Sequence, residues 1–449
     1  MSKQRIQLSD HFTYSRLLRF VLPCIGTMLF TSIYGIVDGL CVSNFVGKTA
    51  FAAVNLIMPL PQLLATIGFM LGTGGSAIVG ITLGEGDQKK ADRYFTLFLL
   101  AALISVSVLA VLGIVFLRPI AVLLGAKGEL LDYAVRYGRI LMVSLPTFAL
   151  QNMFQSFFVT AEKPHLGFWF TVGAGCTNMV LDVLMVGIWG WGVEGAAIAT
   201  FISQLVGGVL PVFYFIDRSN SSRLHLCKTS FYSKVLRDAC INGSSELMTN
   251  LSMSLVNILY NFQLLRLAGE NGVAAYGVIM YAAFLFVAVF VGYAVGSAPI
   301  VSFHYGARNH AEVHNLYRKS LRLIAVVAVT LTLASMFIIP CVARIFVGYD
   351  AELLALTSRA FRLYALSFLI MGFNVYASSF FTALGDGVTS ALISFLRTLA
   401  FQVIAILLLP LLLGIDGIWL AVTAAELAAL AVSAAMLLTK DKVFHYRKV

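Results

Sequence analysis

Two aspartates lie inside long apolar stretches of the chain, where an ionisable side chain is costly. Asp38 follows Arg19 by nineteen positions, and Asp182 follows Lys163 by the same spacing. At a helical rise of 1.5 Å per residue, each aspartate lies roughly 28 Å from its basic neighbour. A carboxylate at membrane depth is tolerated only when it is paired, hydrated or protonated, so we interpret this pair as functional.

Polar residues accompany both aspartates at helical spacing. Tyr34 precedes Asp38 by one turn and Asn178 precedes Asp182 by one turn, so each pair shares a helix face. Thr200 lies about eight residues into the next apolar segment, roughly 12 Å from its outer end. With one backbone carbonyl added, the predicted cation-coupling site consists of six residues: Tyr34, Asp38, Asn178, Asp182, Ala196 and Thr200.

An oxygen-rich cluster of this kind can hold a cation. Oxygen ligands suit Na⁺, for which the candidate ligands are Asp38, Asn178, Asp182 and Thr200. Two desolvated acids that repel each other can instead hold a proton. The alternative for the amide and the hydroxyls is structural, because each could satisfy the backbone or one another.

Composition places these residues in a membrane. Hydrophobic residues make up 59% of the 449 positions and charged residues only 12%, which is too few for a water-soluble surface. A spanning helix needs about 20 mostly apolar residues. The sequence predicts an all-α membrane protein with twelve transmembrane helices: 16–42, 52–83, 93–117, 130–158, 166–189, 192–216, 235–265, 273–303, 318–346, 353–382, 388–412 and 415–439.

The basic residues follow a membrane topology. Segments on the side of the amino terminus hold about four times as many Lys and Arg residues as segments on the other side. The positive-inside rule therefore places both termini in the cytoplasm. The same distribution accounts for the net charge of +10 and argues against a nucleic-acid partner.

Neither thiol chemistry nor an enzyme motif is evident. The six cysteines are scattered without CxxC spacing, so we expect no disulfides, no thiolate metal site and no cofactor other than the coupling ion. Motifs such as DDxxD or GxSxG are absent from the sequence. We therefore expect a protein that is not an enzyme.

The two halves of the chain resemble each other at an offset of about 222 residues. GELLDYAVRYGRI at residue 128 matches AELLALTSRAFRL at 351, and GVEGAAIATFISQL at 192 matches GIDGIWLAVTAAEL at 414. Glu194 and Asp416 in the second match are expected to be loop or helix-start residues at the outer face. We predict an amino-terminal lobe (1–216), a cytoplasmic linker (217–234) and a carboxy-terminal lobe (235–449).

Six helices per half give both lobes the same orientation in the membrane. The pseudo-twofold axis then runs along the membrane normal, with a central cleft between two six-helix bundles. Such bundles can rock so that the cleft opens to each side in turn, which is alternating access. Duplication of a merely structural unit is the other interpretation of the repeat.

The second half lacks the acidic pair. Asp38 corresponds to Asn257 or its neighbour, and Asp182 corresponds to Ile404 or Ala405. We therefore place cation coupling in the first bundle alone.

Other polar residues are candidates for solute binding or for pairing. Arg397 and Glu426 both lie near mid-membrane, where we expect a static ion pair. Glu246 could face the cleft beside Asn242 and attract cationic solutes. Asn152 is a third candidate for substrate binding.

The segments VDG at Asp38, NMVLD from Asn178 to Asp182 and GVEGAAIATFISQ from Gly192 resemble the multidrug and toxic compound extrusion (MATE) family. The resemblance covers essentially the whole chain and is closest to the bacterial MepA-like and DinF-like branches. It implies a cation site at Asp38, Asn178, Asp182 and Thr200, with Tyr34 in its network. It also implies export of organic cations, driven by Na⁺ or H⁺, across a bacterial cytoplasmic (inner) membrane.

Three other functions remain open. A lipid-linked oligosaccharide or lipid flippase shares the wider fold, but an arginine-rich cleft for anionic phosphates is not evident, because only Arg397 lies at depth. A membrane-embedded enzyme and a channel are also conceivable, although paired acids in one lobe suit an occluded site better than a pore ring. We expect a monomer whose partners are small organic cations and membrane lipids.

Overall fold

The computed structural model describes residues 6–45, 48–348 and 350–446, apart from the side chains of residues 36, 38–45, 48 and 345. The described part of the chain is helical and contains no strand. Its first half comprises α1 (Tyr14–Phe45), α2 (Lys48–Ile57), α3 (Pro59–Gly84), α4 (Gln88–Leu123), α5 (Glu129–Thr160), α6 (Pro164–Asp182), the π-helical turn η1 (Val183–Ile188), α7 (Gly192–Gly208) and α8 (Leu210–Ile216). Its second half comprises α9 (Ser233–Gly306), α10 (His310–Val347), α11 (Ala351–Ala365), α12 (Phe368–Ala383), α13 (Gly387–Phe395), the π-helical turn η2 (Leu396–Ala400), α14 (Phe401–Leu413), α15 (Ile415–Thr439) and α16 (Asp441–Phe444).

The helices make twelve membrane crossings, as predicted. Within the described residues, nine helical segments are long and apolar enough to span a membrane, and α11 with α12, bent by 45°, form a tenth. The continuous helix α9 counts twice, because Gly269 has a non-helical conformation with φ 60° at its middle. The twelfth crossing is α5, whose first turns carry Glu129, Asp132, Arg136 and Arg139.

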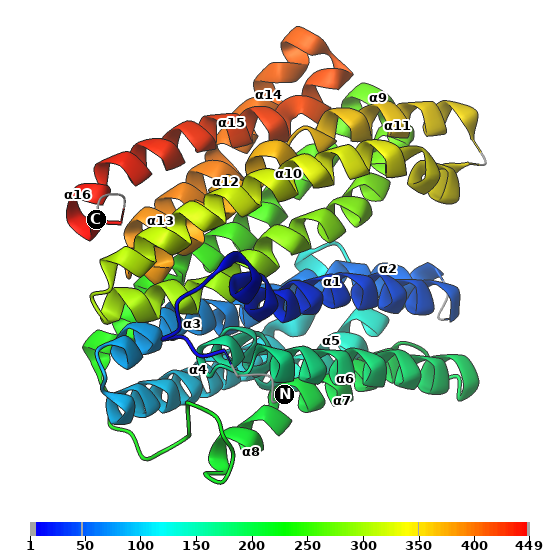
Figure 1. The fold of residues 1–449 in the computed structure, drawn as a ribbon. Helices are drawn as coiled ribbons and strands as arrows, with labels where there is room; N and C mark the ends of the chain where they lie inside the picture. The colour runs from blue at the N-terminus through cyan, green and yellow to red at the C-terminus, as the bar shows by residue number, and fades with distance from the viewer. Residues whose placement is uncertain (1–5, 46–47, 349, 447–449) are drawn as a thin grey trace.

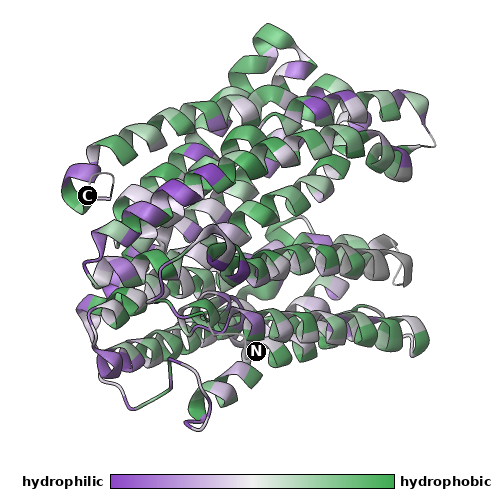
Figure 2. Cartoon of the chain, viewed as in Figure 1, coloured by the Kyte–Doolittle hydropathy of each residue, from purple (hydrophilic) through white to green (hydrophobic). Residues whose placement is uncertain are grey.

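The crossings form two bundles (Figure 1). Helices α1 to α8 gather in one bundle and α10 to α16 in the other, and α9 packs against both α1 and α3. The carboxy-terminal end of the described chain, α16, and the non-helical segment 217–232 lie at one end of the molecule, on the left in Figure 1, which we call the terminal face. Figure 2 shows hydrophobic residues along the helices and hydrophilic residues gathered at that face.

An ion pair recurs at the same place in each half, at the face opposite the terminal face. Arg136 on α5 approaches Glu194 in the first turn of α7 to 3.6 Å. Arg359 on α11 pairs with Asp416 in the first turn of α15. The residues of the first pair and those of the second are separated by the same offset of about 222 residues that relates the two halves. Glu194 and Asp416 are therefore helix-start residues, as predicted.

Glycines bring the two bundles into direct backbone contact in the half of the helices nearer the terminal face. A Cβ atom at Gly243 of α9 would overlap the carbonyl oxygen of Met70 on α3, and one at Gly306 would overlap that of Ile81. Gly292 of α9 lies against the backbone of Ile25 on α1 in the same way. Backbones that approach this closely leave no room for side chains between them, so the two bundles are in closed contact at these points.

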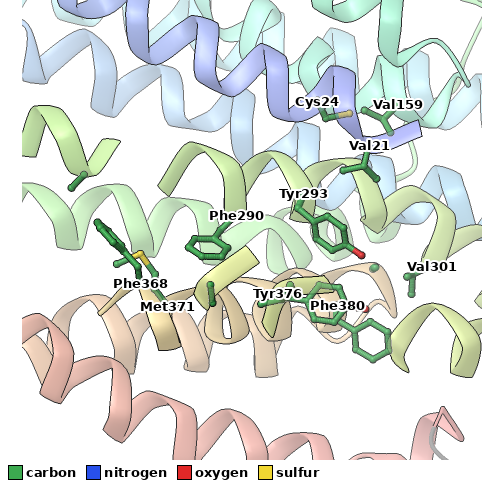
Figure 3. Close-up of a cluster of buried hydrophobic side chains, with 14 of the residues drawn as sticks. Val21, Cys24, Val159, Phe290, Tyr293, Val301, Phe368, Met371, Tyr376 and Phe380 are labelled. Atoms are coloured by element: carbon green, nitrogen blue, oxygen red, sulfur yellow. The ribbon is translucent and has the colours of Figure 1, made fainter. Parts of the chain in front are cut away.

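The apolar core continues across this closed contact. Figure 3 shows Val21, Cys24 and Val159 of the first half facing the cluster of Phe290, Tyr293, Phe368, Met371, Tyr376 and Phe380 in the second half. All of these side chains are buried. The two bundles therefore share one hydrophobic core on this side.

Residues 6–13 cross the terminal face between the bundles, and we call them the N-terminal strap. The Leu8 N–H donates to Glu162 Oε1 at 2.9 Å, in the turn between α5 and α6. The Phe12 N–H donates to Glu312 Oε1 at 2.8 Å, in the first turn of α10. The side chains of Leu8 and Phe12 are fully buried. The strap therefore fastens one bundle to the other.

Candidate functional site

Helix α6 buries two polar residues one turn apart. Asn178 is 2% exposed and Asp182, the last residue of α6, is fully buried. They share a helix face with Gly175, where a Cβ atom would lie 3.4 Å from the ring of Tyr34 on α1. The packing of α1 on α6 therefore brings Tyr34 to the face that carries Asn178 and Asp182.

Asp38 lies on α1 one turn beyond Tyr34, but its side chain is outside the described part of the structure. The position of its carboxylate relative to Asp182 therefore stays a prediction. The backbone of α1 does run alongside α6 and η1, so the two helices that carry the aspartates are neighbours.

The Asn178 side chain has hydrogen-bonding capacity that the described residues do not use. Neither its amide nitrogen nor its amide oxygen has a hydrogen-bond partner among them. A buried polar group without a partner costs about 1–3 kcal/mol. An amide oxygen is also a good ligand for a hard cation. This orphaned side chain, one turn from a buried carboxylate, fits the predicted cation site.

Thr200 and Ala196 are bonded to each other. The Thr200 hydroxyl donates to the Ala196 carbonyl oxygen at 3.0 Å, one turn earlier on α7. This is the backbone bond expected from the structural alternative, and it uses the hydroxyl hydrogen while leaving the hydroxyl oxygen free to accept or coordinate. Helix α7 packs against α6 and η1, so both residues lie on the element next to Asp182.

The helix changes its winding immediately after Asp182. Residues Val183–Ile188 form the π-helical turn η1, and α7 begins at Gly192 directly afterwards. Wider turns of this kind are often found at functional sites, because they redirect side chains and backbone carbonyls. The apolar run from 166 to 189 predicts the span but gives no sign of this turn.

Three glutamines on α5 and α7 also have a buried amide oxygen without a partner among the described residues: Gln151, Gln155 and Gln204. Gln155 lines a small cavity that Thr27 of α1 also borders. These glutamines are not among the residues predicted from the sequence. Their spacing in QNMFQ, within an otherwise apolar stretch of α5, is the signal that would have found Gln151 and Gln155.

The substrate candidates have different surroundings. Asn152 is buried, and its amide nitrogen has no partner among the described residues. The Asn242 amide donates to the carbonyl oxygen of Thr382 at 2.9 Å, and the backbone of Gly387 packs tightly against it. Asn242 therefore uses its donor to hold α9 to α12, while its backbone packs against the start of α13. Glu246 is partly buried, within electrostatic reach of Arg397.

The predicted ion pair of the second half is confirmed. Arg397 Nη1 on η2 lies 3.5 Å from Glu426 Oε1 on α15, and both side chains are largely buried. Asn374 of α12 donates to Glu426 Oε2 at 2.7 Å, and Ser433 donates to the Asn374 oxygen at 2.9 Å. The charge of Glu426 is thus compensated inside the bundle.

Comparison with known proteins identifies the family. The MatE family model matches the chain twice, at residues 23–184 and 247–408, which together make up well over half of it. The chain belongs to the MATE family. The double match also confirms the internal repeat. At the offset between the two MATE matches, Asp38 corresponds to Phe262 and Asp182 corresponds to Ile406. These positions lie a few residues from those expected from the sequence. Neither Phe262 nor Ile406 is acidic, so the acidic pair is missing from the second half.

Curated relatives and solved structures agree with this assignment. The multidrug export protein MepA of Staphylococcus saprophyticus is 21% identical over 434 residues, which cover 96% of this chain and 95% of that protein. MepA of Staphylococcus aureus strain MSSA476 is 22% identical over 433 residues with the same coverage. A MATE crystal structure in complex with MaL6 superposes with a TM-score of 0.92 at 22% identity, covering 99% of this chain and 100% of that one. The outward-facing conformation of a multidrug resistance MATE transporter of the MOP superfamily gives 0.92 at 22% identity, covering 99% of both chains.

Proposed function

We propose that this MATE transporter is a cation-coupled antiporter that exports organic cations by alternating access. The observation that carries the proposal is the buried pair of Asn178 and Asp182, in which the amide has no partner among the described residues. The similarity to the multidrug export protein MepA supports the substrate class. The coupling ion is H⁺ or Na⁺.

The first bundle supplies the coupling chemistry. Asp182 provides the negative charge, Asn178 an amide oxygen, and Thr200 a hydroxyl oxygen whose hydrogen is already donated to Ala196. An ion that neutralises Asp182 would remove the attraction for a cationic solute, so ion and solute would exchange. Asp38, one turn beyond Tyr34, is the proposed second acid.

The second bundle serves as the moving partner. The buried acid of this bundle, Glu426, is already paired with Arg397, so the Glu426 carboxylate is not available to a coupling ion. The same pair argues against a flippase, because the buried arginine is not free to bind a lipid phosphate.

The closed terminal face defines the state of the transporter. We place this face in the cytoplasm of a bacterium, because basic residues gather there. The backbone contacts at Gly243, Gly292 and Gly306 then form the closed cytoplasmic gate, and solute leaves towards the opposite face. A coupling ion drives the change only if it binds the two states with different affinity. We infer that the transporter works as a monomer in the cytoplasmic membrane.

Proteoliposomes test the coupling directly. A fluorescent lipophilic cation is loaded, and its movement is followed while a pH gradient or a Na⁺ gradient is imposed separately. We expect one gradient to drive transport, and we expect Asp182→Asn to abolish that coupling. Glu194→Gln, which removes an exposed acid from the opposite face, is the matched control and should transport normally. Gradient-driven transport at the normal rate by a folded Asp182→Asn protein would refute the proposed mechanism.

A further inference from the structure

A groove of about 1300 Å³ opens at the terminal face beside the first bundle, between α1 and the start of α6. Its walls include Arg16, Arg19 and Phe20 of α1 and His165 and Phe168 of α6. Asp182 lies eighteen residues along α6 from Pro164, which is roughly 27 Å away. The groove is therefore separate from the cation site.

The rim of the groove has an excess of positive charge. Arg16 and Arg19 lie three residues apart on α1, so both face the same side. Arg16 donates to the His11 carbonyl oxygen, whereas Arg19 has no hydrogen bond or ion pair with any described residue. His165 faces them from α6.

Two carboxylates also line the groove, and both are engaged. Asp10 accepts a hydrogen bond from the backbone N–H of Gln7 at 3.2 Å. Glu162 accepts from the Leu8 N–H and from Arg223 Nη1, the latter at 2.6 Å. Arg223 thus compensates Glu162, which leaves the two arginines of α1 to face Asp10.

The groove turns apolar along the direction in which α1 enters the membrane. Leu22, one turn beyond Arg19, is 56% exposed, and Gly26 lies one turn further. A Cβ atom at Gly26 would lie 3.1 Å from the Phe168 ring, so the floor of the groove is where α1 and α6 touch. Trp169 beside it is exposed, as is common for aromatic residues at membrane interfaces.

We propose that this groove binds a single anionic phospholipid of the leaflet on the terminal face. The phosphate would lie between Arg16 and Arg19, and an acyl chain would follow Leu22 towards Phe168. A basic rim followed by an apolar wall matches the order of headgroup and chain in a phospholipid, whereas a free phosphate would use only the rim. The bound lipid would bridge α1 and α6, the two helices that carry the aspartates.

Lipid titration of the purified full-length protein tests the site without any transport measurement. The apparent unfolding temperature in detergent is followed while phosphatidylglycerol, phosphatidylcholine or glycerol 3-phosphate is added. We expect phosphatidylglycerol alone to raise it at micromolar concentrations. The affinity should fall about five-fold in Arg19→Gln and about thirty-fold in the Arg16→Gln/Arg19→Gln protein, given about 1 kcal/mol for each arginine near an anionic lipid surface.

Arg318→Gln, which removes an exposed arginine of α10 outside the groove, is the matched control and should bind like the natural protein. Equal stabilisation by phosphatidylcholine, or by glycerol 3-phosphate, would overturn the assignment of an anionic lipid. So would unchanged binding in the folded double variant. Because Asp182→Asn should bind the lipid normally, failure of this proposal is distinguishable from failure of the proposed transport function.

Discussion

Removal of the Glu312 carboxylate should release the N-terminal strap from the second bundle. Glu312 is nearly fully buried at the start of α10 and accepts from the Phe12 N–H at 2.8 Å and from Asn315 Nδ2 at 2.8 Å. It also meets His11 Nδ1 at 2.6 Å, but His11 is largely exposed, so that ion pair adds little.

The magnitude follows from the groups that Glu312→Ala leaves behind. Asn315 keeps a second acceptor, the Phe12 carbonyl oxygen at 3.1 Å, whereas the Phe12 N–H loses its charged acceptor. A buried donor left without a partner costs about 1–3 kcal/mol, and a hydrogen bond to a charged group contributes about 1.5–3 kcal/mol. We therefore expect Glu312→Ala to shift the free energy of strap release by about 2–3 kcal/mol towards the released form. The equilibrium constant between bound and released strap would change by about 30- to 150-fold.

Amide hydrogen exchange measured by mass spectrometry reports this equilibrium. Peptides covering residues 6–13 should exchange about 30- to 150-fold faster in Glu312→Ala than in the natural protein, while peptides from α12 should be unaffected. Asp238→Ala removes an exposed acid near the terminal end of α9 and is the control that should leave the strap protected. Unchanged exchange of the strap in a folded Glu312→Ala protein would show that Glu312 does not hold the strap in place.

Three further predictions concern the second bundle and its contacts. Arg397→Ala should lower the free energy of unfolding by about 3–5 kcal/mol, because it leaves Glu426 buried and unpaired. The Arg397→Met/Glu426→Leu double variant should recover most of this loss. Thermal unfolding of both proteins checks this prediction. Gly243→Ala should force α3 away from α9 and speed amide hydrogen exchange around Met70. Gly277→Ala on the same helix is the control and should leave this exchange unchanged, because a Cβ atom at Gly277 would meet no other atom within 4 Å. Partial burial of Asp386 opposes its ionisation, but hydrogen bonds from Lys440 and Thr389 outweigh that effect and hold its pKa below the usual value. The stabilisation by Asp386 is therefore complete above the unfolded-state pKa of about 3.9 and is lost as the pH falls through the lower folded-state pKa. Asp386→Asn keeps the helix cap but should unfold at a lower temperature than the natural protein at pH 7, with a difference that vanishes in strong acid; an equal difference at both pH values would contradict this explanation.

The twelve crossings can be predicted from the sequence alone, because the length of each apolar run is a local property and the membrane thickness sets the length that a crossing needs. It also placed Asp182 and Asn178 on one helix face and paired Arg397 with Glu426, since helical spacing and the cost of an isolated buried charge are both readable along the chain. The repeat was visible because duplicated segments keep their order.

Which of these polar groups already have hydrogen-bond partners depends on the folded arrangement of the helices. The carbonyl that Thr200 uses lies on its own helix, but the one that engages Asn242 comes from Thr382, 140 residues away. The strap is a stronger case, because Leu8 and Phe12 bind acids that lie 154 and 300 residues further along the chain. A hydrogen bond depends on atoms within about 3 Å of each other, and composition and periodicity carry no information about which distant segments the packing of two bundles brings that close.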